Sequence, residues 1–389
     1  MCGICGKLSL HPIEKDEILR MANAIRHRGP DDEGFYVNQG IGLGHRRLSV
    51  IDLSTGRQPI GNEDGTVWIV FNGEIYNYRN LRQVLIEKGH RFATQTDTET
   101  IVNAYEEYGE ACVKHLNGMF AFALWDQKKE RLILARDRIG QKPLFYSEVN
   151  GDFLFASEVK ALLADGEVPS QLDPLAMHHF LSLRFVPQPR TMFSGIKKLP
   201  PGHILVHEKG RILIERYWDL SYVPKFDGSE EELVFQLRTQ LMRAVESHLV
   251  SDVPVGAFLS GGLDSTLVAA MAATIQRQPI QTFSMGIDQK GFNEIPFARQ
   301  VAERYRTDHH EWLVQPDILG TLPELIWHLD EPSDPLAACM YAISRLTRQH
   351  VKVVLGGDGG DELFGGYERY WGNQVLGYYS LLPDIIRRQ

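Results

Sequence analysis

The first half of the chain contains short apolar runs separated by polar or glycine-containing connections, a pattern typical of β-strands. The clearest run is Val67–Phe71, and the Asn72-Gly73 dipeptide after it favours a turn. Further strands are expected at 119–125, 131–135 and 152–156, and helical spacing of apolar residues predicts helices at 13–25, 77–88 and 98–108. Strands that follow strands, with segregated helices, favour a largely antiparallel α+β fold.

The pattern changes in the second half to an alternation of strands and helices. We expect strands at 255–259, 280–285 and 351–355, and helices at 229–249, 265–275, 293–305 and 316–329. Ser229 and Glu232 have the spacing of a capping box at the first of these helices. Apolar strands alternating with helices predict a parallel, doubly wound α/β sheet. The change of pattern places a domain boundary near residues 200–225.

Composition and charge narrow the class of protein. The 389 residues suggest two or three domains, and 43% apolar with 23% charged residues exclude wholesale disorder. A net charge of −9 argues against a general nucleic-acid binder. The longest apolar runs, 119–125 and 267–273, have seven residues, whereas a membrane-spanning helix needs roughly 20. Four cysteines are too few for a disulfide framework, and no secretory signal opens the chain, so a cytoplasmic location is expected.

The amino terminus carries a candidate nucleophile. Removal of Met1 would leave Cys2 with both a thiol and a free α-amine, followed by glycines at positions 3 and 6. An α-amine with a pKa of about 7.7–8.0 can act as the base that deprotonates the thiol. The rival interpretation is that Cys2 and Cys5 form half of a zinc site or a redox pair, but no second cysteine or histidine pair follows at a suitable spacing.

Two glycine clusters in the second half are typical of phosphate binding. The segment Ser260-Gly261-Gly262-Leu263-Asp264-Ser265 follows an apolar strand and opens a helix, where backbone N–H groups can cradle an anion. It has neither the lysine of a Walker A loop nor the G-x-G-x-x-G spacing of a dinucleotide site. The second cluster, 356–362, sets three carboxylates among glycines after another strand, which fits Mg²⁺ and phosphate better than a solvated acidic turn.

Several motifs together resemble a known family. Behind Cys2 come His27-Arg28-Gly29-Pro30-Asp31, Arg47–Asp52, Asn72–Asn77 and Asp97, an order that resembles the class II glutamine amidotransferase domain. The S-G-G-x-D-S loop is similar to the pyrophosphate loop of ATP pyrophosphatases. Both halves together resemble glutamine-hydrolysing asparagine synthetases over nearly the whole chain. The resemblance implies an αββα N-terminal-nucleophile hydrolase sandwich followed by an α/β doubly wound ATP-pyrophosphatase-type domain. We therefore expect a glutaminase domain at 2–200, a connecting segment at 201–228 and an ATP-binding domain at 229–389.

The resemblance implies roles for the glutaminase residues. Cys2 attacks the glutamine side-chain amide, forms a thioester and releases ammonia. Asn72 and Gly73 form the oxyanion hole, whose donors are each worth about 10²–10³ in rate. Arg47 binds the α-carboxylate, while Glu74 and Asp97 hold the α-amine. The rest of the implied glutamine site is Leu48, Ser49, Val50 and Ile51.

The resemblance also implies a two-step synthetase reaction with ATP and Mg²⁺. ATP activates the side-chain carboxylate of aspartate as an acyl-adenylate, and ammonia delivered through an internal tunnel then displaces AMP. Leu259 and Met285 would flank the adenine or ribose, and Asp358 would support the adenylate. The implied pyrophosphate residues are Ser260, Gly261, Gly262 and Ser265, the nucleotide-loop residues are Gly356 and Gly357, and the Mg²⁺ ligands are Asp264 and Asp361.

Departures from the family pattern leave alternatives open. Gly356 stands where many members have serine, and Asp358 is a glutamate in some of them. Family synthetase domains extend further than Gln389, so the second domain is expected to be incomplete, with 382–389 as the start of a helix. The acceptor is aspartate or another carboxylate, such as a uronic acid or a natural-product precursor. A regulatory protein without synthetase chemistry is a further alternative, and a homodimer is the assembly considered.

Overall fold

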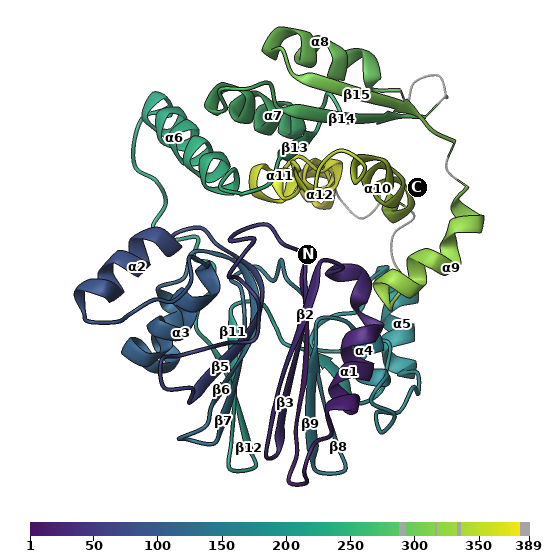
Figure 1. The fold of residues 1–389 in the computed structure, drawn as a ribbon. Helices are drawn as coiled ribbons and strands as arrows, with labels where there is room; N and C mark the ends of the chain where they lie inside the picture. Colours follow the sequence, from purple (N-terminus) through teal and green to yellow (C-terminus); the bar gives the residue numbers. More distant parts are fainter. Residues whose placement is uncertain (288–292, 316, 333–335, 382–389) are drawn as a thin grey trace. The chain divides into compact units, whose positions relative to one another are not determined.

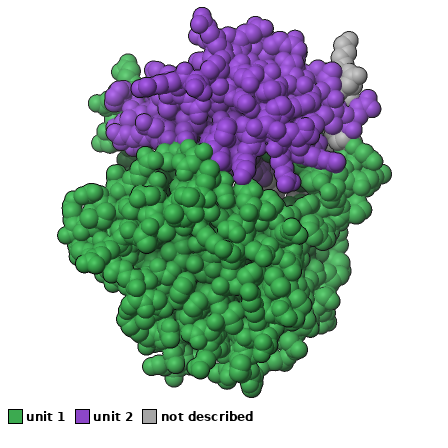
Figure 2. Space-filling view, viewed as in Figure 1, with its two compact units in different colours: residues 1–234, 250–252, 317–341 green, residues 235–249, 253–316, 342–389 purple. Residues whose placement is uncertain are grey.

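The computed structural model describes residues 1–287, 293–315, 317–332 and 336–381. The chain divides into two compact units (Figure 2): unit 1 comprises 1–234, 250–252 and 317–341, and unit 2 comprises 235–249, 253–316 and 342–389. The helix start expected at 382–389 lies outside the described residues. None of the helices in the described ranges is long and apolar enough to cross a membrane.

Unit 1 contains two six-stranded sheets in which all strand pairs are antiparallel. The first sheet has the order β10 (Ile196–Lys198), β8 (Phe145–Val149), β9 (Asp152–Ala156), β1 (Gly3–Leu8), β3 (Ile41–Arg47) and β2 (Asp32–Asn38). The second has the order β12 (Arg211–Arg216), β11 (His203–Glu208), β7 (Arg131–Arg136), β6 (Gly118–Asp126), β5 (Val67–Ile75) and β4 (Ile60–Gly61).

Three hydrophobic clusters bind these sheets and their helices into four layers. One cluster joins the facing sides of the two sheets, with Ile4 and Leu43 from the first sheet and Val70 and Leu134 from the second. A second cluster packs helices α2 (Tyr78–Glu87) and α3 (Asp97–Tyr108) on the outer face of the second sheet, and a third packs α1 (Lys15–Ala24) and α4 (Val159–Leu163) on that of the first (Figure 1). The expected αββα sandwich is confirmed.

The remaining elements of unit 1 include a segment distant in sequence. They are η1 (Arg26–Arg28), η2 (Gly109–Lys114), α5 (Pro174–Leu183) and α9 (Ile318–Leu329). Residues 201–228 were expected to form a connecting segment, whereas they contain β11 and β12, which pair with each other, and β11 also pairs with β7. Helix α9, expected in the ATP-binding domain, likewise belongs to unit 1.

The turn expected at Asn72-Gly73 is wrong. Strand β5 continues through both residues to Ile75, and Asn72 pairs with Ala121 of β6. Gly73 does not have a positive φ angle. Instead, a Cβ atom at Gly73 would lie 2.1 Å from the Met119 carbonyl oxygen, so the glycine permits close approach of the two strands.

Unit 2 is built on a four-stranded parallel sheet, as the alternating pattern predicted. Its order is β15 (Asp308–Leu313), β14 (Gln281–Gly286), β13 (Val255–Phe258) and β16 (Val353–Leu355). Its helices are α6 (Glu230–His248, beginning in unit 1), α7 (Leu263–Ile275), α8 (Ile295–Tyr305), α10 (Leu336–Thr347, also beginning in unit 1), α11 (Gly360–Phe364) and α12 (Glu368–Ser380). The capping box is present: the Ser229 N–H donates to Glu232 Oε2 at 2.9 Å, and the Glu232 N–H donates to Ser229 Oγ at 3.2 Å.

Candidate active site

Cys2 lies directly before β1 and contacts the backbone after β3. Its Sγ atom is 3.4 Å from the Leu48 amide nitrogen and 3.7 Å from the Leu48 carbonyl oxygen. Its own carbonyl oxygen accepts a hydrogen bond from Arg28 Nε at 2.9 Å. Burial raises the pKa of the Cys2 thiol, while the terminal amine and the Leu48 N–H oppose that increase. The thiol therefore needs a base before it can act as a nucleophile.

The α-amine beside this thiol belongs to Met1 in the full chain. Although the Met1 side chain is largely exposed, desolvation lowers the pKa of the α-amine to about 5, and the neighbouring Arg28 and Lys142 charges act in the same direction. The Met1 amine of the full chain is therefore neutral at pH 7.

The side chain of Asn72, on β5, is buried without a hydrogen-bond partner. It is 1% exposed, and neither its Nδ2 nor its Oδ1 atom has a hydrogen-bond partner. Leaving a buried polar group unpaired costs about 1–3 kcal/mol. A bound group that accepts a hydrogen bond from Nδ2 would remove part of that cost, which fits the expected oxyanion role.

Glu74 and Asp97 form a pair of interacting carboxylates in this region. The Ile75 N–H donates to Asp97 Oδ2 at 2.9 Å, at the first turn of α3. Burial raises the pKa of Asp97 to about 6. Burial, and then the charge of Asp97, raise the pKa of Glu74 well above its usual range. Two such groups stabilise a cation placed between them, and the α-ammonium of glutamine is one.

Arg47 organises the loop of residues 48–52. Its Nη2 atom donates to the Ile51 and Asp52 carbonyl oxygens at 3.2 and 2.5 Å. The Ser49 N–H donates to Asp31 Oδ2 at 2.9 Å, and the Asp252 N–H donates to the Val50 carbonyl oxygen at 3.0 Å. Within the described ranges the buried guanidinium has no carboxylate partner, so its charge is available to an anionic ligand.

Two charged residues near Cys2 were not identified from the sequence. Burial lowers the pKa of Lys142 to about 8, and its Nζ atom lies 3.2 Å from Met1 Sδ. Glu158 accepts a hydrogen bond from Arg28 Nη1 at 2.7 Å. Arg28 lies in the motif of residues 27–31, but the resemblance implied no role for it. For Glu158 the available signal was a charged residue closely following the apolar strand 152–156; Lys142 has no comparable signal.

In unit 2 the two glycine clusters lie at neighbouring strand ends. Strands β13 and β16 pair in parallel, with Ala257 opposite Leu355. A Cβ atom at Gly357 would lie 2.8 Å from the Ser265 amide nitrogen, so the clusters are in contact. Gly261 takes a φ of +87°. The hydroxyl oxygens of Ser260 and Ser265 are 2.8 Å apart, and the Gly262 N–H donates to Ser260 Oγ at 3.1 Å. This arrangement suits an anion at the start of α7.

The acidic residues of these clusters fit a cation bound together with phosphate. Asp264 and Asp361 form no hydrogen bond or ion pair through their carboxylates within the described ranges. A Cβ atom at Gly360 would lie 2.4 Å from Asp264 Oδ2, so this glycine makes room for that carboxylate. The described residues contain no group of three or more metal-ligating side chains. One or two carboxylates plus substrate phosphates are nevertheless what Mg²⁺ commonly uses.

Leu259, Met285 and Gly356 were also expected to contact the nucleotide. Leu259 is 1% exposed and belongs to the core of unit 2; its N–H donates to the Phe283 carbonyl oxygen, and its own carbonyl oxygen accepts a hydrogen bond from Ser284 Oγ. Met285 is half-buried near the end of β14. A Cβ atom at Gly356 would lie 2.4 Å from Asp358 Oδ2, so this glycine makes room for the Asp358 carboxylate.

Comparison with known proteins adds independent evidence. Residues 1–218 match the family model of the glutamine amidotransferase domain, and residues 236–381 match that of asparagine synthase. Asparagine synthetase [glutamine-hydrolyzing] 1 of Bacillus subtilis is 39% identical, over 100% of this chain and 62% of its own length. Putative asparagine synthetase [glutamine-hydrolyzing] 2 of Methanocaldococcus jannaschii is 37% identical, over 100% of this chain and 79% of its own. Amidase chyE of Penicillium rubens is 35% identical, over 91% and 55%. The chain thus spans 62% of the length of the first of these relatives.

Proposed function

Because this chain belongs to the glutamine-hydrolysing asparagine synthetase family, we propose that it uses glutamine and ATP to convert aspartate into asparagine. The observation that carries the glutaminase part is an electrostatic cluster around Cys2. The charges of the terminal amine and of Arg47 lower the pKa of the Cys2 thiol, and that of Glu74 raises it, although the three groups come from separate segments of the chain. An unpartnered buried amide, that of Asn72, lies on the same strand as Glu74.

Glutamine hydrolysis begins with a proton transfer from the Cys2 thiol to the α-amine that Met1 removal exposes. The thiolate attacks the side-chain amide carbon, and Asn72 Nδ2 with the Gly73 N–H stabilises the resulting oxyanion. The C–N bond then breaks, the amine returns its proton to the leaving group, and ammonia departs. Water hydrolyses the Cys2 thioester to glutamate.

Binding of glutamine uses charges that the protein itself leaves uncompensated. Arg47 takes the α-carboxylate, and Glu74 with Asp97 takes the α-ammonium. The backbone of Leu48, Ser49, Val50 and Ile51 lines the same side, held by Asp31 and Asp252. Binding therefore favours the ionised forms of Glu74 and Asp97, since a nearby cation lowers the pKa of both carboxylates.

The synthetase step uses the two loops of unit 2. Ser260, Gly261, Gly262 and Ser265 hold the pyrophosphate of ATP, while Leu259, Met285, Gly356 and Gly357 contact the rest of the nucleotide. Asp264 and Asp361 would hold Mg²⁺, which neutralises charge on the departing pyrophosphate. The aspartate carboxylate attacks the α-phosphorus, pyrophosphate leaves, and Asp358 supports the acyl-adenylate. Ammonia then attacks the acyl carbon and AMP leaves.

A second candidate is amidation of a different carboxylate by the same chemistry. It is favoured by the 35% identity to a relative named an amidase rather than an asparagine synthetase. The glutaminase and nucleotide residues are shared, so only the acceptor distinguishes the two. Cytoplasmic location and a homodimer complete the proposal; the first rests on cysteine usage and the second on the resemblance alone.

The decisive experiment measures glutamate, AMP and pyrophosphate release with candidate acceptors. The wild-type chain should release glutamate, and Cys2→Ala should abolish that release while sparing any amide formation driven by added ammonia. Cys339→Ala is the matched control and should leave glutamate release unchanged. Glutamate release by Cys2→Ala at the wild-type rate would refute the nucleophile. AMP formation with another acid but not with aspartate would favour the second candidate.

A further inference from the structure

Glu158, two residues after β9, connects three basic side chains. Its carboxylate accepts a hydrogen bond from Arg28 Nη1 at 2.7 Å, has its Oε2 atom 3.0 Å from His27 Nε2, and forms an ion pair with Lys160. Burial alone would raise the pKa of Glu158, but the His27 hydrogen bond and the Arg28 and Lys160 charges lower it to about 2. The carboxylate is therefore ionised throughout the neutral range.

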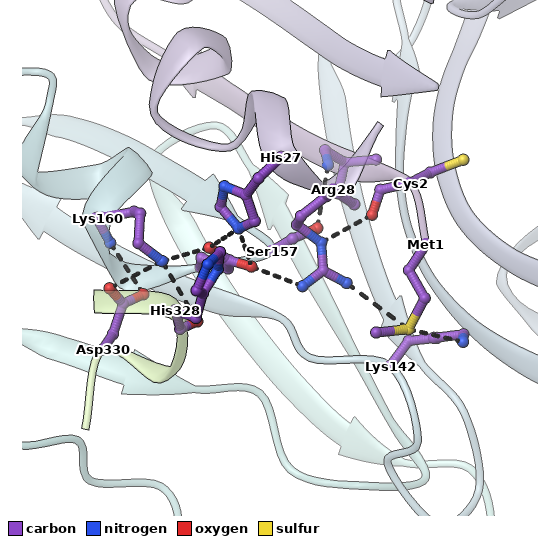
Figure 3. A network of polar contacts seen from close by, with 11 residues as sticks. Met1, Cys2, His27, Arg28, Lys142, Ser157, Lys160, His328 and Asp330 are labelled. Atoms are coloured by element: carbon purple, nitrogen blue, oxygen red, sulfur yellow. Dashed lines mark hydrogen bonds and ion pairs between the residues drawn. The ribbon is translucent and has the colours of Figure 1, made fainter. Parts of the chain in front are cut away.

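These contacts lead to the nucleophile. Arg28 donates through Nε to the Cys2 carbonyl oxygen at 2.9 Å (Figure 3). The neighbouring Ser157 accepts a hydrogen bond from the Ile4 N–H at 3.0 Å through its hydroxyl. The Ser157 N–H donates to the Ile4 carbonyl oxygen at 2.9 Å. Residues 157 and 158 thus hold the backbone on both sides of Gly3.

The same cluster receives a residue from the region that matches the asparagine synthase family. Asp330 follows α9, and its Oδ1 atom is 3.1 Å from Lys160 Nζ. Its Oδ2 atom accepts a hydrogen bond from the Lys160 N–H at 3.2 Å. The ring of His27 lies 4.9 Å from the rings of Trp327 and His328. All of these residues belong to unit 1.

We propose that Glu158 is a positioning residue for the Cys2 nucleophile, and that Asp330 completes its support by sharing Lys160. This inference rests on the proposed glutaminase function. It makes glutamine hydrolysis dependent on a residue outside the stretch that matches the amidotransferase family.

The physical reason is competition for one cation. Lys160 lies between Glu158 and Asp330, so neutralising Asp330 leaves the whole charge of Lys160 to attract Glu158. The Glu158 carboxylate is then free to reorient together with Lys160, which would weaken its bond to Arg28 and loosen the Arg28 contact with the Cys2 carbonyl. A misplacement of about 1 Å at a reacting atom can cost about 10²-fold in rate. Glutamine itself is held by Arg47 and Asp97, which this cluster does not contact, so KM should stay constant.

The test is steady-state glutamate release by the full chain carrying single and paired substitutions. We expect Glu158→Gln to lower kcat about tenfold and Asp330→Asn about threefold, each with KM within about twofold of wild type. Asp330→Glu keeps the charge and should restore most of kcat. In a Lys160→Met background, Asp330→Asn should have no further effect, because Lys160 transmits the change.

A matched control uses the second ion pair of the same segment. Lys198 Nζ lies 2.6 Å from Glu331 Oε2, and neither residue contacts Glu158. Lys198→Gln should leave kcat unchanged; an effect equal to that of Asp330→Asn would mean that docking of the segment alone matters, and would overturn the inference. So would unchanged kcat in both Glu158→Gln and Asp330→Asn. If Glu158→Gln does not fold, as judged by thermal melting, the Lys160–Asp330 cycle decides. A wild-type chain without glutaminase activity refutes the proposed function instead.

Discussion

Asn72, Glu74 and Asp97 have side chains whose hydrogen bonds or charges the protein does not fully balance. The amide of Asn72 is unpartnered, and burial raises the pKa values of both acids. Each of these features destabilises the folded chain without substrate. Such features are concentrated at functional sites, where a ligand supplies the missing partner.

Replacement of Asn72 by alanine should lower kcat for glutamine hydrolysis about 10²-fold, because one oxyanion donor is lost. The free energy of unfolding should not decrease, since the wild-type amide forms no hydrogen bond and its burial is itself unfavourable. Kinetic assays and chemical denaturation check both parts. Asn38→Ala, at the end of β2, is the control for loss of an asparagine and should retain full activity. A decrease below about threefold for Asn72→Ala would contradict the assigned role.

The pKa of about 6 at Asp97 predicts how KM for glutamine depends on pH. Below that value Asp97 is protonated and cannot pair with the substrate ammonium, so KM should rise as pH falls from 7 to 5. Asp97→Asn should raise KM at pH 7 and remove this dependence. Protein stability depends on pH in the opposite direction from glutamine binding. Because the pKa of Asp97 in the folded state lies above the usual value of about 3.9, the free energy of unfolding decreases as pH rises from about 4 to 6. A KM that does not vary between pH 5 and 7 would exclude Asp97.

At the scale of single elements, interior glycines obscured two strands of the first sheet. Helices α1, α2 and α3 have periodic apolar positions, and their observed ends lie close to the expected ones. Strands β1 and β3 contain interior glycines, which weaken the local strand signal, and were not predicted. The reason for these glycines is tertiary: a Cβ atom at Gly42 would lie 2.5 Å from Ile18 of α1. The helix packs against backbone that no side chain covers.

Gly42→Ala should therefore destabilise unit 1 by about 1–3 kcal/mol through overpacking. The midpoint of chemical denaturation measures the loss. Adding Ile18→Ala removes the atoms that the new methyl group meets, so the two changes should be less than additive. Gly372→Ala in α12 is the control. A Cβ atom at Gly372 would meet no atom within 4 Å outside the helix's own nearby backbone, so this change should not destabilise the chain. Full additivity at Gly42 and Ile18 would contradict the packing explanation.

At the scale of the whole molecule, the units are not continuous stretches of sequence. Unit 1 takes in Val250–Asp252 and Asp317–Tyr341 in addition to residues 1–234. Asp252 shows the consequence: its Oδ2 atom accepts a hydrogen bond from the Asp52 N–H at 2.7 Å, and its own N–H donates to Val50. The loop that Arg47 organises is thus held by a residue 200 positions further along the chain.

Asp252→Ala should loosen the loop of residues 48–52 and raise KM for glutamine about three- to tenfold, since one hydrogen bond to a carboxylate contributes about 1.5–3 kcal/mol at most. The value of kcat should change less, because Cys2 and Asn72 do not contact Asp252. Glutamate-release kinetics across glutamine concentrations would show the separation. Asp227→Ala, in the exposed stretch before α6, provides a control for charge loss. Equal decreases in kcat and in kcat/KM would contradict a role confined to substrate binding.

By itself, the sequence determined a candidate nucleophile, the order of the glutaminase motifs and the two glycine clusters, because each is carried by a few adjacent residues whose chemistry is local. It also determined the two kinds of sheet, since apolar periodicity reports which side of a strand is buried. Only the tertiary structure decided that Asn72 is unpartnered, that Glu74 and Asp97 share one environment, and that Asp330 belongs with Glu158 and Lys160. These properties depend on burial and on charges brought together from distant positions, and no local pattern records them.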